Sequence, residues 1–136
     1  MSKTIVWRKG ILYSSNSPIG RRVKINDDSV AYSMNGVDVE FLDKGFMTKR
    51  AVIKGADNHS IGEIIKKKWS KRARITFKNG NEYLLKKTGL FSRKWKMTAG
   101  RNPIMDFHFS LTKGEINYLF EDEILILSGL YVINGK

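Results

Sequence analysis

The stretch IIKKKWSKRARITFKNGNEYLLKK, residues 64–87, decides the fold because it contains a complete hairpin signal. Apolar and polar residues alternate on both sides of Asn79-Gly80, and this period of two is typical of a strand with one buried face. An Asn-Gly pair between two such runs is a strong turn signal. The sequence therefore predicts an antiparallel hairpin that turns at Gly80.

Two registers of this hairpin compete. A two-residue type I′ turn would pair Phe77 with Glu82 and so put a carboxylate on the apolar face. A three-residue loop with Gly80 left-handed instead gives the pairs Phe77–Asn81, Ile75–Tyr83 and Ala73–Leu85. A one-residue slip moves every side chain to the other face, so the buried face selects the three-residue loop. We then expect Arg74, Glu82 and Lys86 to share the outer face.

Similar alternation recurs at residues 37–41, 95–97 and 107–109, with turn signals between the runs. This spacing predicts a mainly β protein, an antiparallel meander that closes into a barrel-like or sandwich sheet. A chain of 136 residues is long enough to bury one core, so we expect a single domain over residues 1–136.

The final segment, EDEILILSGLYVINGK (residues 121–136), follows another pattern. Acids in a first turn favour a helix, and Asn134-Gly135 is a suitable C-terminal stop. Such a helix would be apolar on nearly all sides, as a helix enclosed by other structure must be. The alternative is a fully buried strand, because Ile, Val and Tyr favour strands. We favour the buried helix.

Strands followed by one apolar helix resemble the tubby C-terminal-like fold of tubby proteins, plant LURP-one-related proteins and phospholipid scramblases. The resemblance is carried by residues 60–87, the strand at Trp95 and residues 123–136. Gly62-Glu63-Ile64 stands where the family has a G-x-I strand, and Asn79-Gly80 where it has an N/D-G turn. The resemblance implies a closed antiparallel barrel threaded by a hydrophobic helix.

The net charge of +12 arises entirely between Lys66 and Arg101, where thirteen basic residues accompany the single acid Glu82. The candidate anion-binding residues are Lys66, Lys67, Lys68, Lys71, Arg72, Arg74, Lys78, Lys86, Lys87, Arg93, Lys94 and Lys96. Alternation predicts that Arg74, Lys78, Lys86 and Lys96 project outward, with Lys66–Lys68 and Arg93-Lys94 at strand ends or turns beside them. So local an asymmetry indicates an anionic partner, although strands that simply present lysines to water are the competing interpretation.

Acidic lipid headgroups or a membrane surface are the partner we favour, since clustered lysines are attracted to such surfaces. Nucleic acid is the first alternative, with Trp69 and Trp95 stacking on bases, although both tryptophans fit core positions better. A protein-interaction module with an acidic partner is the second. Without a signal peptide or an apolar run of roughly 20 residues, we expect a cytoplasmic protein that is peripheral to a membrane.

Catalysis has little support in the sequence. The absence of cysteine excludes thiolate chemistry, and no nucleotide, hydrolase or metalloprotease motif occurs. His59 lies in a predicted turn, whereas His108 shares a strand face with Asp106 and lacks a visible third partner. We therefore expect a non-catalytic protein with no metal or cofactor.

Overall fold

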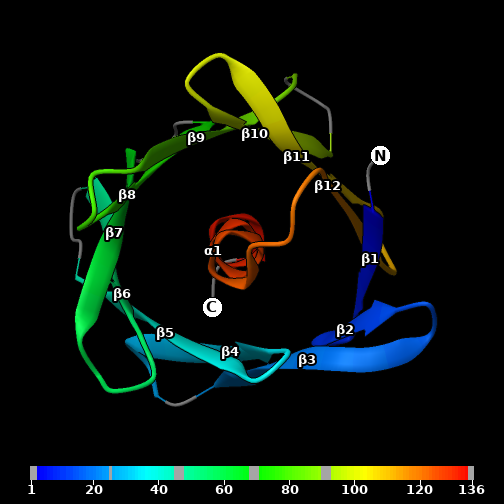
Figure 1. Cartoon of the computed structure of the whole chain (residues 1–136), viewed down its shortest axis with the longest axis horizontal. Helices are drawn as coiled ribbons and strands as arrows, with labels where there is room; N and C mark the ends of the chain where they lie inside the picture. The colour runs from blue at the N-terminus through cyan, green and yellow to red at the C-terminus, as the bar shows by residue number, and fades with distance from the viewer. Residues whose placement is uncertain (1–2, 25, 45–47, 68–70, 90–92, 135–136) are drawn as a thin grey trace.

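The computed structural model describes residues 3–24, 26–44, 48–67, 71–89 and 93–134, which form twelve strands and one helix (Figure 1). The strands are β1 Lys3–Arg8, β2 Ile11–Ser14, β3 Ser17–Lys24, β4 Ser29–Met34, β5 Val37–Asp43, β6 Thr48–Lys54, β7 Ser60–Lys67, β8 Arg72–Phe77, β9 Glu82–Lys87, β10 Lys94–Ala99, β11 Asn102–Phe109 and β12 Gly114–Tyr118. The helix α1 is Glu123–Asn134.

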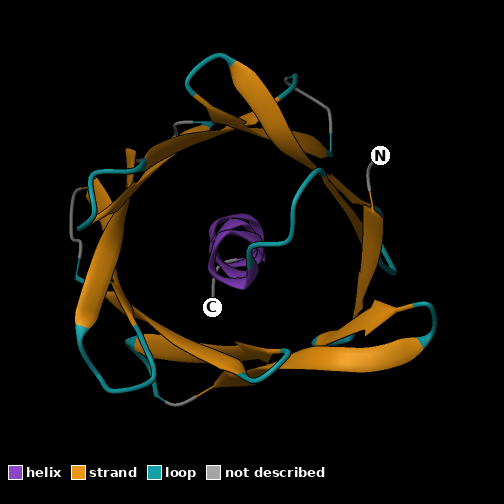
Figure 2. Ribbon diagram, viewed as in Figure 1, coloured by secondary structure: helices purple, strands orange, loops and turns teal. Residues whose placement is uncertain are grey.

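Each strand pairs antiparallel with the next, and β1 pairs with β12 to close a barrel. The helix α1 runs through the interior along the barrel axis, as Figures 1 and 2 show. The architecture that the family resemblance implied, a closed antiparallel barrel around a C-terminal helix, is therefore confirmed. Between the barrel and the sandwich that alternation allowed, the chain forms the barrel.

The two ends of the barrel differ and are named here by their charges. The lysine end is the end at which β8 begins and β9 stops, and it includes Lys71, Lys87 and Arg93. The carboxylate end is the one at which α1 begins, beside Glu121 and Asp122. Because α1 crosses the interior, its last turn points toward the lysine end.

The β8–β9 hairpin adopts the predicted register. Ile75 lies opposite Tyr83 and Ala73 opposite Leu85. The N–H of Phe77 donates to the carbonyl of Asn81 at 2.9 Å, which closes the three-residue loop. Gly80 has a φ of +97°, a conformation that a side chain would disfavour. The prediction from the buried face is confirmed.

The inward residues of the strands enclose α1 on all sides. Ile75, Leu85 and Met97 of neighbouring strands are completely buried, as are Leu125–Leu127 and Leu130 of the helix. Helical residues on opposite faces are thus equally covered, which explains why the segment lacks an apolar stripe. The predicted helix is confirmed, and the buried-strand alternative is wrong.

Residues before the helix fix its start. The Oδ1 atom of Asp122 accepts a hydrogen bond from the N–H of Leu125 at 3.1 Å, as an N-cap residue does. The neighbouring acids Glu121 and Glu123 lie at the positive end of the helix dipole. The acidic triplet therefore acts as the helix start that the sequence predicted.

Ser128 and Gly129 interrupt the apolar helix for two separate reasons. The hydroxyl of Ser128 donates to the carbonyl of Ile124 at 2.7 Å, so the buried hydroxyl has a partner. At Gly129, an added Cβ atom would lie 2.3 Å from Cζ of Phe107 on β11. Glycine is therefore required where the helix packs on the ring of Phe107.

Candidate anion-binding surface

A row of three cations crosses the outer face of β8, β9 and β10. Arg72 lies opposite Lys86, and Lys86 lies opposite Lys96. All three side chains are exposed, and we call them the basic row. Like charges directly opposite each other destabilise a sheet, so this arrangement works against folding. The next residue in register, Asp106 of β11, ends the row with a carboxylate.

The residues beside the basic row are mixed in character. Arg74 forms an ion pair with Glu82, with 3.1 Å between Nε and Oε1. Leu84 lies opposite Arg74 and is 37% exposed, although exposure of an apolar side chain to water is unfavourable. Ile65 of β7 faces Arg74 from the other side and is half-buried. Two apolar residues, Ile65 and Leu84, therefore lie beside the basic row, with Arg74 between them.

Arg93 and Lys94 extend the positive surface toward β11. Both side chains are exposed, and Lys94 lies opposite His108. The N–H of Phe109 donates to the carbonyl of Arg93 at 3.0 Å, which ties this corner to the end of β11. The outward placement that alternation predicted is confirmed for Arg74, Lys86 and Lys96.

Lys66, Lys71 and Lys87 occupy a different position, the inner rim of the barrel at the lysine end. Lys66 follows the buried Ile64 at a spacing of two, so it has inward parity. Lys87 and Lys71 are linked by a 2.9 Å backbone hydrogen bond and take the same parity. All three side chains are half-buried. These three lysines therefore do not lie on the outer surface, and the candidate anion-binding residues on that surface are fewer than the sequence predicted.

An aromatic ring supports one of these inner-rim lysines. The Nζ atom of Lys66 lies 5.4 Å from the centroid of the Trp95 ring, within cation–π range. Lysine at a strand end can keep its stem on the apolar wall while the ammonium group reaches the opening. The last turn of α1 carries no basic residue of its own, so the inner-rim lysines provide the positive charge at the end where the helix dipole is negative.

The sequence also singled out Lys67, Lys68, Trp69 and Trp95. Lys68 and Trp69 lie outside the described residues, as does the stacking role considered for Trp69. Lys67 is the last residue of β7 and lies opposite Thr48. Trp95 points into the barrel and is 9% exposed, opposite the buried Phe107. Core packing of Trp95 is confirmed, so its ring is not presented beside the outer cations.

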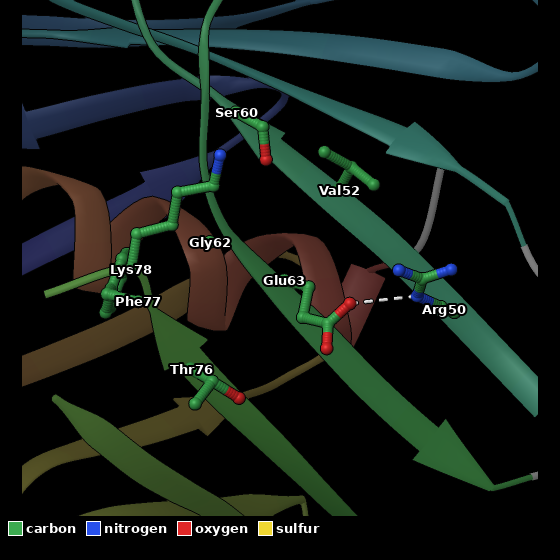
Figure 3. A pocket seen from close by; sticks show the side chains of 8 residues that line it. All are labelled: Arg50, Val52, Ser60, Gly62, Glu63, Thr76, Phe77 and Lys78. Carbon is green, nitrogen blue, oxygen red and sulfur yellow. Dashed lines mark hydrogen bonds and ion pairs between the residues drawn. The ribbon is translucent and has the colours of Figure 1, made fainter. Parts of the chain in front are cut away.

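Lys78 lies away from the basic row, in the β8–β9 loop at the carboxylate end. It borders a hollow of about 320 Å³ in the outer wall formed by β6, β7 and β8. Figure 3 shows Lys78 on one side of the hollow and an ion pair on the other, with 2.9 Å between Arg50 Nε and Glu63 Oε2. A carboxylate lines this hollow, so Lys78 and Arg50 do not form a purely positive site.

Gly62, the first residue of the G-x-I pattern, is one of the residues that line this hollow. A Cβ atom at Gly62 would lie 2.5 Å from the carbonyl oxygen of Thr76. β7 and β8 therefore approach too closely here for any side chain. The glycine therefore has a packing role.

The histidines remain at the surface. His108 and Asp106 share the outer face of β11, opposite Lys94 and Lys96. His59 lies 3.7 Å from Asp57 in an exposed loop. Within the part of the chain that the structure describes, no three His, Cys, Asp or Glu residues gather as metal ligands would. That neither histidine supports catalysis stays a prediction.

Tyrosines at the interior are the groups whose ionisation is most altered. Burial raises the pKa of Tyr32 to about 12, opposed by the nearby charge of Arg22. Burial also raises the pKa of Tyr131 to about 12, helped by the negative charge of Asp43. Tyr131 stacks on Phe41 with ring centroids 4.6 Å apart. Tyr32 belongs to the core of the barrel, and Tyr131 packs from α1 onto its wall.

Comparison of the chain with protein-family models, curated proteins and solved structures found no match. Among the described residues, no helix is long and apolar enough to cross a membrane.

Proposed function

We propose that this protein is a non-catalytic barrel module that docks on an anionic surface through its basic row, with acidic lipid headgroups of a membrane as the partner. The observation that carries the proposal is the register of Arg72, Lys86 and Lys96, three exposed cations directly opposite one another. Three cations side by side on one exposed face form a surface that a negatively charged partner would recognise.

The size of the expected attraction is sufficient for reversible attachment. Each lysine or arginine near an acidic membrane contributes about 1 kcal/mol. The basic row with Arg93 and Lys94 would then contribute about 5 kcal/mol, or between three and four powers of ten in affinity. The attraction acts over about one Debye length, ~8 Å at physiological salt, so it should weaken as salt is added.

Lipid is favoured over nucleic acid by exposed Leu84. This side chain is 37% exposed beside the basic row, and an apolar side chain next to cations suits a lipid surface better than the phosphates and bases of nucleic acid. Trp95, the described tryptophan considered for base stacking, is buried. The architecture also supports the proposal that the chain belongs to the tubby C-terminal-like group, and its place would be the cytoplasmic face of a membrane.

Two binding assays test this proposal. The protein is sedimented with vesicles of phosphatidylcholine and phosphatidylserine, and it is run in gel shifts with single- and double-stranded oligonucleotides, each at low and physiological salt. We expect sedimentation that grows with phosphatidylserine content and weakens with salt. Gel shifts without vesicle binding would establish nucleic acid as the partner. Absence of both at low salt would leave the basic row as a solvated surface and overturn the proposal.

A further inference from the structure

The two ends of the barrel differ in charge as well as in position. The charged residues in the described connections at the lysine end are Lys9, Asp27, Asp28, Lys44, Lys71, Arg93 and Lys113. Those at the carboxylate end are Asp57, Lys78, Arg101, Glu121 and Asp122. The inner-rim lysines add further positive charge to the lysine end. The molecule is therefore electrically polar along the barrel axis.

An unusually exposed leucine lies at the lysine end. Leu111, in the connection between β11 and β12, is 89% exposed. Its loop is fixed by Ser110, whose hydroxyl oxygen accepts a hydrogen bond from the N–H of Lys113 at 3.2 Å and whose N–H donates to the carbonyl of Lys113 at 2.8 Å. The leucine is thus held in water by a closed turn.

Two cations belong to the region around Leu111. Lys113 is two residues away and pairs with Glu115, with 3.4 Å between Nζ and Oε1, and Arg93 is joined to Phe109, at the start of the loop, by a 3.0 Å backbone hydrogen bond. A single exposed leucine has no meaning by itself, because folded proteins expose many. A leucine on a fixed loop at the positive end of the barrel, however, suits an acidic bilayer, which has negative charge at its surface and hydrocarbon just beneath.

We propose that the barrel docks end-on, with the lysine end against an acidic lipid bilayer and Leu111 inserted below the headgroups. The proposal rests on the proposed function and adds to it the orientation and the inserted residue. In this orientation Arg93, Lys94 and Lys113 lie at headgroup level, and the inner-rim lysines face the membrane. The basic row lies close to the same end, because Arg72 is the first residue of β8 and Lys86 the last but one of β9. Glu121 and Asp122 are then at the far end, away from the negative lipid.

The carboxylate end provides a matched control. Leu119 is 59% exposed and lies next to Phe120, itself 48% exposed, so this end presents at least as much apolar surface. Its neighbours, however, are the acids Glu121 and Asp122. If apolar exposure alone directed docking, both leucines would enter the bilayer. If charge polarity directs it, Leu111 alone does so.

The absence of cysteine makes a direct experiment possible, because one introduced cysteine is the only labelling site. Leu111→Cys and Leu119→Cys are each labelled with the polarity-sensitive fluorophore NBD and titrated with phosphatidylcholine–phosphatidylserine vesicles. We expect a blue shift and brighter emission at position 111 and no change at position 119. Labelled proteins that sediment with vesicles while position 111 stays in water would overturn the end-on orientation but keep the proposed function.

A second pair of variants measures the affinity. Leu111→Ser should weaken vesicle binding about tenfold, and Leu119→Ser should leave it unchanged. Both residues are exposed, so neither change should alter the melting temperature. Equal affinities of the two variants would contradict insertion of Leu111. If the unmodified protein fails to sediment at all, the proposed function fails first and the inference with it.

Discussion

The inner and outer faces of β8, β9 and β10 are built from the same strands and have opposite properties. On the inner face Ala73, Leu85 and Met97 lie opposite one another, and all three are buried. One residue away on each of these strands, the basic row lies in the same register and is exposed. The inner face therefore supplies stability, and the outer face supplies charge that stability does not need. Folding and binding should be separable by mutation.

The largest effect should come from removing what the inner face encloses. Deletion of residues 124–136 takes away Leu125, Ile126, Leu127 and Leu130, which are completely buried. At about 1.5–3 kcal/mol for each side chain, the loss is comparable to the entire stability of a domain, roughly 5–15 kcal/mol. We expect no cooperative unfolding in a calorimetric scan. A sharp transition in the truncated protein would mean that the barrel stands without its helix.

A single methyl group tests the same contact more gently. Gly129→Ala places Cβ 2.3 Å from Cζ of Phe107, a buried ring that cannot move aside freely. Overpacking of this kind costs about 1–3 kcal/mol, which exceeds the ~1 kcal/mol that alanine gains over glycine in a helix. Urea unfolding should therefore show a net loss of stability. A gain would mean that the helix and the wall are not in contact there.

Alkaline pH should also act on the inner face. Tyr32 and Tyr131 have a pKa of about 12 in the folded protein against 10.0 in an unfolded chain. Their contribution to stability is complete below pH 10.0 and is lost as the pH rises toward 12, because only the unfolded state releases the protons in that interval. The melting temperature should fall there, and absorbance at 295 nm should show late-ionising tyrosines. Ionisation of all tyrosines near pH 10.0 in folded protein would contradict this burial.

The smallest changes in stability should come from charge reversals on the outer face. One such reversal should stabilise the protein, and another at a neighbouring position should destabilise it. Lys86→Glu puts a carboxylate between Arg72 and Lys96 and should raise the stability by a few tenths of a kcal/mol. Arg74→Glu instead sets two carboxylates together, since Arg74 pairs with Glu82 at 3.1 Å, and should lower it by a similar amount. Urea titrations of the two variants measure the difference. Equal shifts would mean that the basic row is not strained.

Local patterns were enough to predict much of this fold. The register at Gly80 followed from requiring one apolar face, and the helix at residues 123–134 followed from its acidic start and its apolar surface on all sides. Closure of the barrel could not be derived, because it depends on pairing between β1 and β12. Their partners, such as Trp7 and Gly114, are far apart in the sequence, and no local pattern specifies them. Alternation allowed either a barrel or a sandwich, and only the family resemblance specified a closed barrel.

The candidate site was less accessible to sequence reasoning. The inward parity of Lys66, Lys71 and Lys87 was available from alternation with Ile64, Ala73 and Leu85. The sequence analysis instead placed Lys66 at a strand end or turn beside the outer cations and assigned no face to Lys71 and Lys87. A lysine at a strand end can take an inward position and still keep its charge in water. Its aliphatic stem lies along the apolar wall, and its ammonium group extends beyond the rim of the barrel. No sequence pattern predicted that Leu111 is exposed. Apolar residues are expected to be buried, and only the structure of the loop shows that this one is not.

The central claim is that the basic row exists for binding and not for folding. Its most direct test compares two variants of equal net charge in vesicle sedimentation. One combines Arg72→Glu, Lys86→Glu and Lys96→Glu, and the other combines Lys3→Glu, Arg21→Glu and Arg101→Glu, which reverses exposed cations elsewhere. Both should fold with melting temperatures near that of the unmodified protein. We predict that the first loses about 100-fold or more in affinity for phosphatidylserine vesicles, while the second keeps most of it. Equal losses in the two variants would mean that only total charge matters, and would contradict the claim.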